Sequence, residues 1–146
     1  MNRNRELIAI LRGLTFARCV TVGEILIAEG FCKLEVPLNS PNPMKTISEM
    51  QNRFGDSVTI GAGTVTNVSE VRELSNLGCQ MIVSPNTDTE VIEATKNKGM
   101  LSFPGAFTPS ECFAAINAAA DGIKIFQHLS LELRVLRHLK RCCQAI

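Results

Sequence analysis

The chain has 146 residues, 45% of them hydrophobic and 20% charged, and a formal net charge of +1. These values are typical of one ordinary globular domain. The basic residues are dispersed and the chain has neither Trp nor Tyr, so we expect no nucleic-acid surface. The apolar run over residues 7–11 is too short for a signal peptide or a membrane span, so we expect a cytoplasmic protein with no membrane partner.

The cysteines argue against a metal site. None of the six belongs to a C-x-x-C pair, and no histidine accompanies the first four. Scattered thiols in a chain without a secretory segment indicate reduced cysteines rather than zinc ligands. We therefore expect no bound metal.

Six apolar runs with strand-like composition follow one another, and each gap between them carries a helical pattern. The runs are LIAIL (7–11), LEVPL (34–38), VTIGAG (58–63), MIVSP (81–85), LSFPG (101–105) and GIKIF (122–126). Strands and helices that alternate every ~23 residues predict βαβ units and a parallel sheet.

Local signals mark where the intervening helices begin and end. Pro43 after Asn42 is typical of a helix start. Capping-box pairs, which satisfy free backbone N–H groups, are predicted at Thr21/Glu24, Asn67/Glu70, Thr87/Glu90 and Thr108/Glu111. The left-handed conformation that ends many helices is predicted at Gly30, Gly55, Gly78 and Gly99.

Two α/β architectures fit this alternation. A doubly wound sheet usually carries a glycine-rich phosphate turn after an early strand, and none follows residues 7–11. The regular period favours a (β/α)8 TIM barrel, which typically needs about 200 residues or more. The predicted fold class is therefore α/β, an incomplete TIM barrel with about six of its eight βα units.

Strand periodicity indicates which polar side chains face the lumen of such a barrel. Leu34 and Val36 share one face of their strand, which leaves Glu35 on the other face. Ile123 and Ile125 likewise leave Lys124 on the opposite face of the sixth strand. If the apolar faces pack against the helices, Glu35 and Lys124 point into the lumen, near the ends of the strands where barrel enzymes act.

A lysine within an apolar strand needs either a partner or a function. Burial there costs an ammonium several kcal/mol of solvation, which favours the free amine that Schiff-base chemistry requires. Lys124 is therefore a candidate nucleophile. The alternative is a structural ion pair between Lys124 and Glu35 inside the barrel.

Two further strand ends carry candidate substrate-binding residues. Arg12, after the first strand, is suited to bidentate binding of a carboxylate or phosphate, although it could equally be a solvated strand end. Thr64 follows Gly61 and Gly63, which would let a substrate approach the backbone while the hydroxyl binds it. The alternative for Thr64 is plain strand packing.

Six motifs in register carry a family resemblance. They are ILRG (10–13), LEVPLNSP (34–41), GAGTV (61–65), IVSPN (82–86), FPGAFTPSE (103–111) and KIF (124–126). Over residues 5–126 the chain closely resembles the 2-dehydro-3-deoxy-6-phosphogalactonate aldolases. Their sister group is the 2-dehydro-3-deoxy-6-phosphogluconate aldolases, and EVPLNSP favours the galactonate branch over it. Another phosphate-binding barrel, such as an epimerase or a thiamin-phosphate synthase, fits these motifs less well.

The resemblance implies a class I aldolase. Lys124 would form a Schiff base with the C2 ketone of the phosphorylated 2-keto-3-deoxy sugar acid, and Glu35 would shuttle protons through a water. Arg12 and Thr64 would hold the pyruvyl half of the substrate. The resemblance further implies no metal or organic cofactor, pyruvate and D-glyceraldehyde 3-phosphate as products, and a homotrimer.

The resemblance stops after Phe126, and residues 127–146 differ in composition from the rest. This segment holds both histidines, the adjacent pair Cys142–Cys143 and a local charge of +3. It can be interpreted as an amphipathic helix, with a basic membrane-surface helix as a weaker variant. We favour a frameshift: residues 1–126 would form a partial aldolase domain and residues 127–146 a divergent tail. An inactive truncated fragment is then the alternative to an active aldolase.

The frameshift hypothesis predicts a specific coding sequence. Synonymous codons for the tail, read one base earlier from Ile125, can encode FPASFLGTPGIKAFKAVLPSN, which resembles the family's loop and sixth helix. Sequencing the DNA beyond codon 125 should reveal this second reading frame. A gene without it would mean that the tail is a genuine divergent segment.

Overall fold

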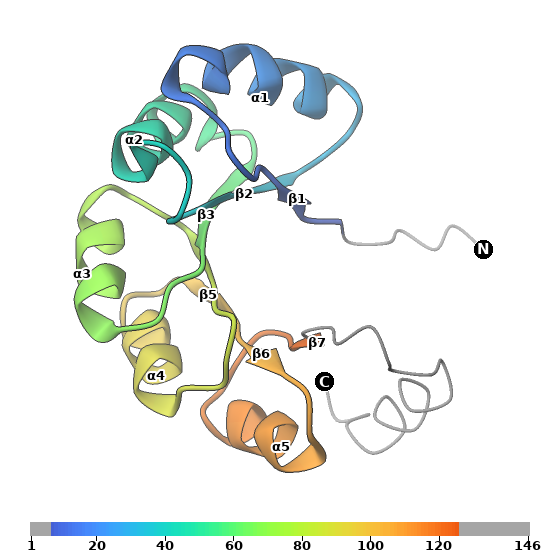
Figure 1. Cartoon of the computed structure of the whole chain (residues 1–146), viewed down its shortest axis with the longest axis vertical. Coiled ribbons are helices and arrows are strands. Elements are labelled where there is room, and N and C mark those ends of the chain that lie inside the picture. Colours follow the sequence, from blue (N-terminus) through green and yellow to red (C-terminus); the bar gives the residue numbers. More distant parts are fainter. Residues whose placement is uncertain (1–6, 126–146) are drawn as a thin grey trace.

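The computed structural model describes residues 7–125. In this range, strands line the inner side of an open arc and helices cover its outer side, with β1 and β7 at the two ends (Figure 1). This is an arc of a (β/α)8 barrel, and the predicted fold class is confirmed. The predicted divergent tail, residues 127–146, lies outside the described residues.

Strands and helices alternate along the chain. The strands are β1 (Ala9–Ile10), β2 (Lys33–Pro37), β3 (Thr59–Gly63), β4 (Met81–Val83), β5 (Leu101–Phe103), β6 (Gly105–Ala106) and β7 (Lys124–Ile125). The helices are η1 (Phe16–Arg18), α1 (Cys19–Ala28), α2 (Pro43–Phe54), α3 (Val68–Asn76), α4 (Thr89–Asn97) and α5 (Pro109–Asn117). Within residues 7–125, none of these helices is long and apolar enough to cross a membrane.

Pro104 divides the fifth barrel strand into β5 and β6. β5 pairs in parallel with β4, whereas β6 pairs in parallel with β7. Proline has no N–H to donate, but its carbonyl accepts the N–H of Lys124 at 2.9 Å. The strand order therefore runs from β1 to β7 through both halves of the fifth strand.

The main hydrophobic core lies between the sheet and the helices. Leu34 and Val36 of β2 are fully buried in it, as are Ile60 and Ala62 of β3. Successive side chains of a strand point to opposite faces, so the residues between these four face the inner side of the arc. The predicted division of β2 into a helix face and a lumen face is confirmed.

Helix starts follow the predicted capping signals in α3 and α5. Thr108 and Glu111 form a complete capping box at the start of α5. At α3 the Asn67 side chain accepts the N–H of Glu70 at 3.0 Å, but the Glu70 carboxylate accepts the N–H of Thr66 instead of reaching back to Asn67. The second box is therefore half formed.

The other two capping predictions are wrong. α1 begins at Cys19, which places Thr21 inside the helix, and its preceding residue makes no side-chain cap. α4 is capped by Asp88, whose Oδ1 accepts the N–H of Glu90 at 3.0 Å. The Thr87 hydroxyl instead donates to the carbonyl of Gly105 at 2.8 Å. The Thr87 hydroxyl therefore makes a tertiary hydrogen bond instead of the local capping bond that the motif predicted.

Three of the four predicted helix-ending glycines are left-handed. Gly30, Gly78 and Gly99 have φ values of 88°, 78° and 72°. The prediction for Gly55 is wrong, because its φ is −60° and it continues the right-handed turn of α2. Ala119 occupies the corresponding position after α5, with a φ of 64°. This left-handed conformation is less favourable for alanine than for glycine, because alanine has a Cβ atom.

Candidate active site

Glu35 lies on the inner face of β2, in a row of register partners that crosses five strands. Its partners are Ile10 on β1 and Gly61 on β3, and the row continues through Met81 and Leu101. Register partners in a parallel ladder point to the same face of the sheet. Glu35 is thus the ionisable member of a row of apolar side chains and glycine.

The Glu35 carboxyl is enclosed. Its residue is 2% exposed, and its Oε2 atom has no hydrogen-bond partner among the described residues. Burial raises the pKa of this carboxyl above its ordinary value of 4.5, while the nearby charges of Lys124 and Arg12 oppose the rise. A carboxyl with a raised pKa exchanges protons closer to neutral pH, as general acid–base catalysis requires.

Lys124 begins β7 and borders a mainly apolar cavity of about 220 Å³. Strands from the two ends of the arc contribute to this cavity, which is lined by Ile8, Ile10, Val83, Phe103, Ile123 and Lys124. The structure thus brings Lys124 and Glu35, predicted from strand parity, to one inner surface.

Arg12 follows β1 and is exposed. Its charge acts on the Glu35 carboxyl, so it belongs to the same electrostatic site. It also borders a separate hollow of about 290 Å³, to which Arg18 contributes. Within residues 7–125, no three His, Cys, Asp or Glu side chains are grouped so that they could hold a metal ion.

Thr64 is exposed and lies directly after β3 with a φ of 62°. This left-handed conformation is rare for a β-branched residue and costs about 1–3 kcal/mol. Backbone strain of this kind persists where the surroundings enforce it, and it concentrates at functional sites. The left-handed conformation makes Thr64 a candidate functional residue independently of the sequence motif that contains it.

The sequence model of the KDPG and KHG aldolase family matches residues 1–140. The chain belongs to the KDPG and KHG aldolase family. The resemblance seen in the six motifs is thereby confirmed, and the family match extends past residue 126, where those motifs end.

The curated relatives include aldolases of the galactonate branch. The chain is 43% identical over 122 residues to a probable 2-dehydro-3-deoxy-6-phosphogalactonate aldolase of Rhizobium meliloti, covering 84% of this chain and 58% of that protein. It is 40% identical over 134 residues to the 2-dehydro-3-deoxy-6-phosphogalactonate aldolase of Escherichia coli, covering 92% of this chain and 65% of that protein. The chain thus spans less than two thirds of the length of these relatives.

A solved structure supports the same assignment. The native KDPGal structure superposes with a TM-score of 0.91 at 38% identity, covering 97% of this chain and 68% of that one. The strands that carry Glu35 and Lys124 therefore belong to a fold that this chain shares with the native KDPGal structure.

Gly63 has a steric role at the candidate site that strand periodicity alone did not reveal. A Cβ at this position would overlap the Oε1 and Cδ atoms of Glu35, so the carboxyl occupies the space that a side chain would fill. The two glycines of the GAG motif predicted that some group approaches the backbone of this strand closely, but not that the group is the Glu35 carboxyl.

This contact predicts a non-additive pair of substitutions. Gly63→Ala should lower the free energy of unfolding by about 1–3 kcal/mol, because an added methyl group in a filled site forces neighbours to move. The cost should fall to near zero in a Glu35→Ala background, where the space is free. Denaturant unfolding of the four proteins of this cycle measures the difference. An equal cost in both backgrounds would contradict the steric explanation.

Proposed function

We propose that this chain is a class I aldolase that cleaves 2-dehydro-3-deoxy-6-phosphogalactonate to pyruvate and D-glyceraldehyde 3-phosphate. The observation that carries the proposal is the placement of Lys124 at a mainly apolar cavity, within the electrostatic reach of the buried Glu35. The 43% and 40% identities to galactonate-branch aldolases favour this substrate over the gluconate epimer.

Lys124 is proposed as the nucleophile. Its neutral amine adds to the C2 carbonyl of the substrate to form a carbinolamine, and loss of water gives a protonated imine. The imine draws the electron pair of the C3–C4 bond toward nitrogen as that bond breaks, while the C4 hydroxyl loses its proton and becomes the aldehyde. Protonation of the resulting enamine at C3 and hydrolysis of the imine release pyruvate and restore the amine.

Glu35 is proposed as the group that moves these protons. Addition, dehydration, C–C cleavage and enamine protonation each require a proton to be delivered or removed near the imine carbon. The raised pKa of Glu35 keeps both of its protonation states accessible closer to neutral pH. Its unpartnered Oε2 atom is suited to act through a water that reaches the substrate.

Arg12 and Thr64 are proposed to hold the pyruvyl half of the substrate. Arg12 offers a planar set of donors that matches a carboxylate. Thr64 offers a hydroxyl at a backbone position held in a strained left-handed conformation, beside the glycine that accommodates Glu35. Binding there would bring C2 of the substrate toward the Lys124 amine.

The proposal is tested by a cleavage assay on the full chain. Pyruvate release is followed with the 6-phosphogalactonate derivative and, in parallel, with the 6-phosphogluconate derivative. We expect a higher kcat/KM for the galactonate compound. A preference for the gluconate compound would assign the chain to the sister activity. No release with either would favour the inactive-fragment alternative.

The partners and the chain organisation are part of the same proposal. We propose a cytoplasmic homotrimer, for which the exposed Phe107 and Phe113 offer apolar surface that a second copy could cover. Light scattering during size-exclusion chromatography measures the assembly.

We also propose that residues 1–126 form the aldolase domain and residues 127–146 a divergent tail. The DNA sequence beyond codon 125 tests that division.

A further inference from the structure

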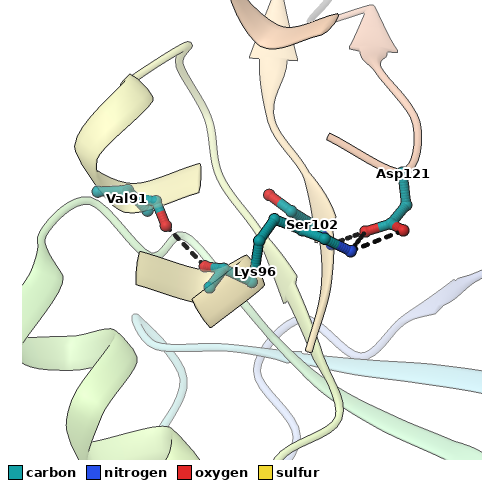
Figure 2. Close-up of polar contacts among 5 residues, drawn as sticks. Val91, Lys96, Ser102 and Asp121 are labelled. Carbon is teal, nitrogen blue, oxygen red and sulfur yellow. Dashed lines mark hydrogen bonds and ion pairs between the residues drawn. The ribbon is translucent and has the colours of Figure 1, made fainter. Parts of the chain in front are cut away.

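Asp121 lies in the segment between α5 and β7 and contacts both β5 and α4. Its main-chain N–H donates to the carbonyl of Ser102 at 2.9 Å, while its Oδ2 atom accepts the N–H of Ser102 at 2.8 Å. The Lys96 amine donates to both oxygens of the same carboxylate, at 2.8 and 2.6 Å. Figure 2 shows the Lys96 amine and the Ser102 main chain converging on Asp121.

The paired contacts with Ser102 imitate one step of a strand ladder. Asp121 donates with its main chain and accepts with its side chain, so both main-chain groups of Ser102 are satisfied on the edge of β5 that faces away from β4. Ser102 is buried, at 3% exposed, where an unpaired N–H is costly. A carboxylate accepts such a bond more strongly than a neutral group does.

The strand that carries Lys124 is short within the described residues, where it comprises Lys124 and Ile125. In the part of the chain that the structure describes, β7 pairs with β6 at two positions, Lys124 with Gly105 and Ile125 with Ala106. Pro104, the residue between β5 and β6, has no N–H to donate to this strand. The Pro104 carbonyl accepts the N–H of Lys124, and the contacts of Asp121 with Ser102 add a second register point before it in the chain.

Register decides which way Lys124 faces. A slip of one residue moves every side chain of a strand to the opposite face, which would turn Lys124 away from the cavity and toward the helices. We infer that Asp121 is a positioning residue for Lys124. Its carboxylate, bound to the Ser102 amide, holds the segment that leads into β7 in the register that presents Lys124 to Glu35. This inference rests on the proposed role of Lys124 as the nucleophile.

The ion pair with Lys96 contributes less than the contact with Ser102. The two charged side chains are each 29% exposed, and exposed pairs add little because solvent screens them. Lys96→Met is therefore a matched control that removes the ion pair and leaves the Ser102 contact. Asp121→Asn is the complementary variant, since its amide oxygen can still accept the Ser102 N–H.

Two measurements on the full chain test the inference. The first is the rate at which borohydride traps pyruvate on Lys124, read by peptide mass spectrometry well below each variant's melting temperature. We expect Asp121→Ala to lower this rate at least about tenfold, with Asp121→Asn and Lys96→Met within about twofold of the wild type. A purely structural role would lower the melting temperature and leave the trapping rate of the folded protein unchanged.

The second measurement does not depend on aldolase activity. Acetic anhydride labelling of Lys124 without pyruvate reports whether its amine is enclosed, and we expect it to rise several-fold in Asp121→Ala alone. If the wild type fails to trap pyruvate while labelling changes as expected, the proposed function fails and the positioning role stands. Wild-type trapping together with wild-type labelling in Asp121→Ala overturns the inference.

Should Asp121→Ala be unfolded by circular dichroism, Asp121→Glu decides. It retains the charge and the reach to Lys96, but moves the carboxylate by one methylene from the Ser102 amide. We expect reduced trapping and increased labelling of Lys124 in that variant. Wild-type values for both in the folded Asp121→Glu protein would equally overturn the inference.

Discussion

Lys124→Ala is expected to abolish pyruvate trapping by borohydride and to reduce aldol cleavage by at least about 10⁴-fold, because removing a covalent nucleophile removes the reaction path itself. In the wild-type chain, reduction in the presence of pyruvate should add one reduced pyruvyl group to Lys124. Peptide mass spectrometry identifies the labelled residue. The effect is expected to be the largest of any single substitution, since within residues 7–125 no other lysine lines the mainly apolar cavity at Lys124.

Two controls separate nucleophilicity from charge. Lys124→Arg keeps a positive charge near Glu35 but cannot lose its proton, so it too should form no adduct. Lys98→Ala removes an exposed lysine at the end of α4 and should leave both trapping and cleavage unchanged. An adduct that persists in Lys124→Ala, or that forms on another lysine, would falsify the assignment of the nucleophile.

Glu35→Gln is expected to lower kcat by about 10²–10⁴-fold while retaining some imine formation, because proton transfer contributes a factor of that size. Glutamine fills nearly the same space beside Gly63 but cannot exchange a proton in this pH range. The exposed Glu73→Gln on α3 is the matched control and should retain wild-type turnover. Unchanged turnover in Glu35→Gln would remove Glu35 from the mechanism.

The same substitution should change how stability depends on pH. The pKa of Glu35 is raised in the folded protein, so the folded state binds this proton more tightly than the unfolded state does. The stabilisation is fully present below the ordinary pKa of 4.5 and is lost as the pH rises through the folded value. Glu35→Gln cannot lose a proton, so it should be more stable than the wild type at neutral pH.

Denaturant unfolding at several pH values measures this difference. We expect the stability advantage of Glu35→Gln to shrink as the pH falls and to vanish below 4.5, where Glu35 is protonated in both states. A variant that is less stable than the wild type at neutral pH would indicate that the attraction of Glu35 to the charges of Lys124 and Arg12 outweighs the burial of its own charge. Function and stability would then favour the same residue.

The sequence by itself determined the element pattern and the two inner-face candidates. The alternation of strands and helices follows from local hydrophobic periodicity. The sequential order of the strands around the barrel follows from that alternation. The parity of Leu34 and Val36 placed Glu35 on the lumen side, because a strand has a fixed period of two. The same argument predicts Lys124 on that side, although Ile123, its predicted counterpart on the opposite face, borders the same cavity. The complete capping box of α5 was likewise predictable, since all of its contacts are local.

The tertiary structure decided what depends on neighbouring strands. The Thr87 hydroxyl donates to the Gly105 carbonyl, and Asp88 caps α4 in its place. This exchange depends on the packing of the loop against a neighbouring strand, which the local sequence does not specify. The fit of Glu35 against Gly63 and the contact of Asp121 with Ser102 join residues that are far apart in the sequence. Their distances are set by sheet curvature and register, which arise from the whole arc rather than from any local stretch of sequence.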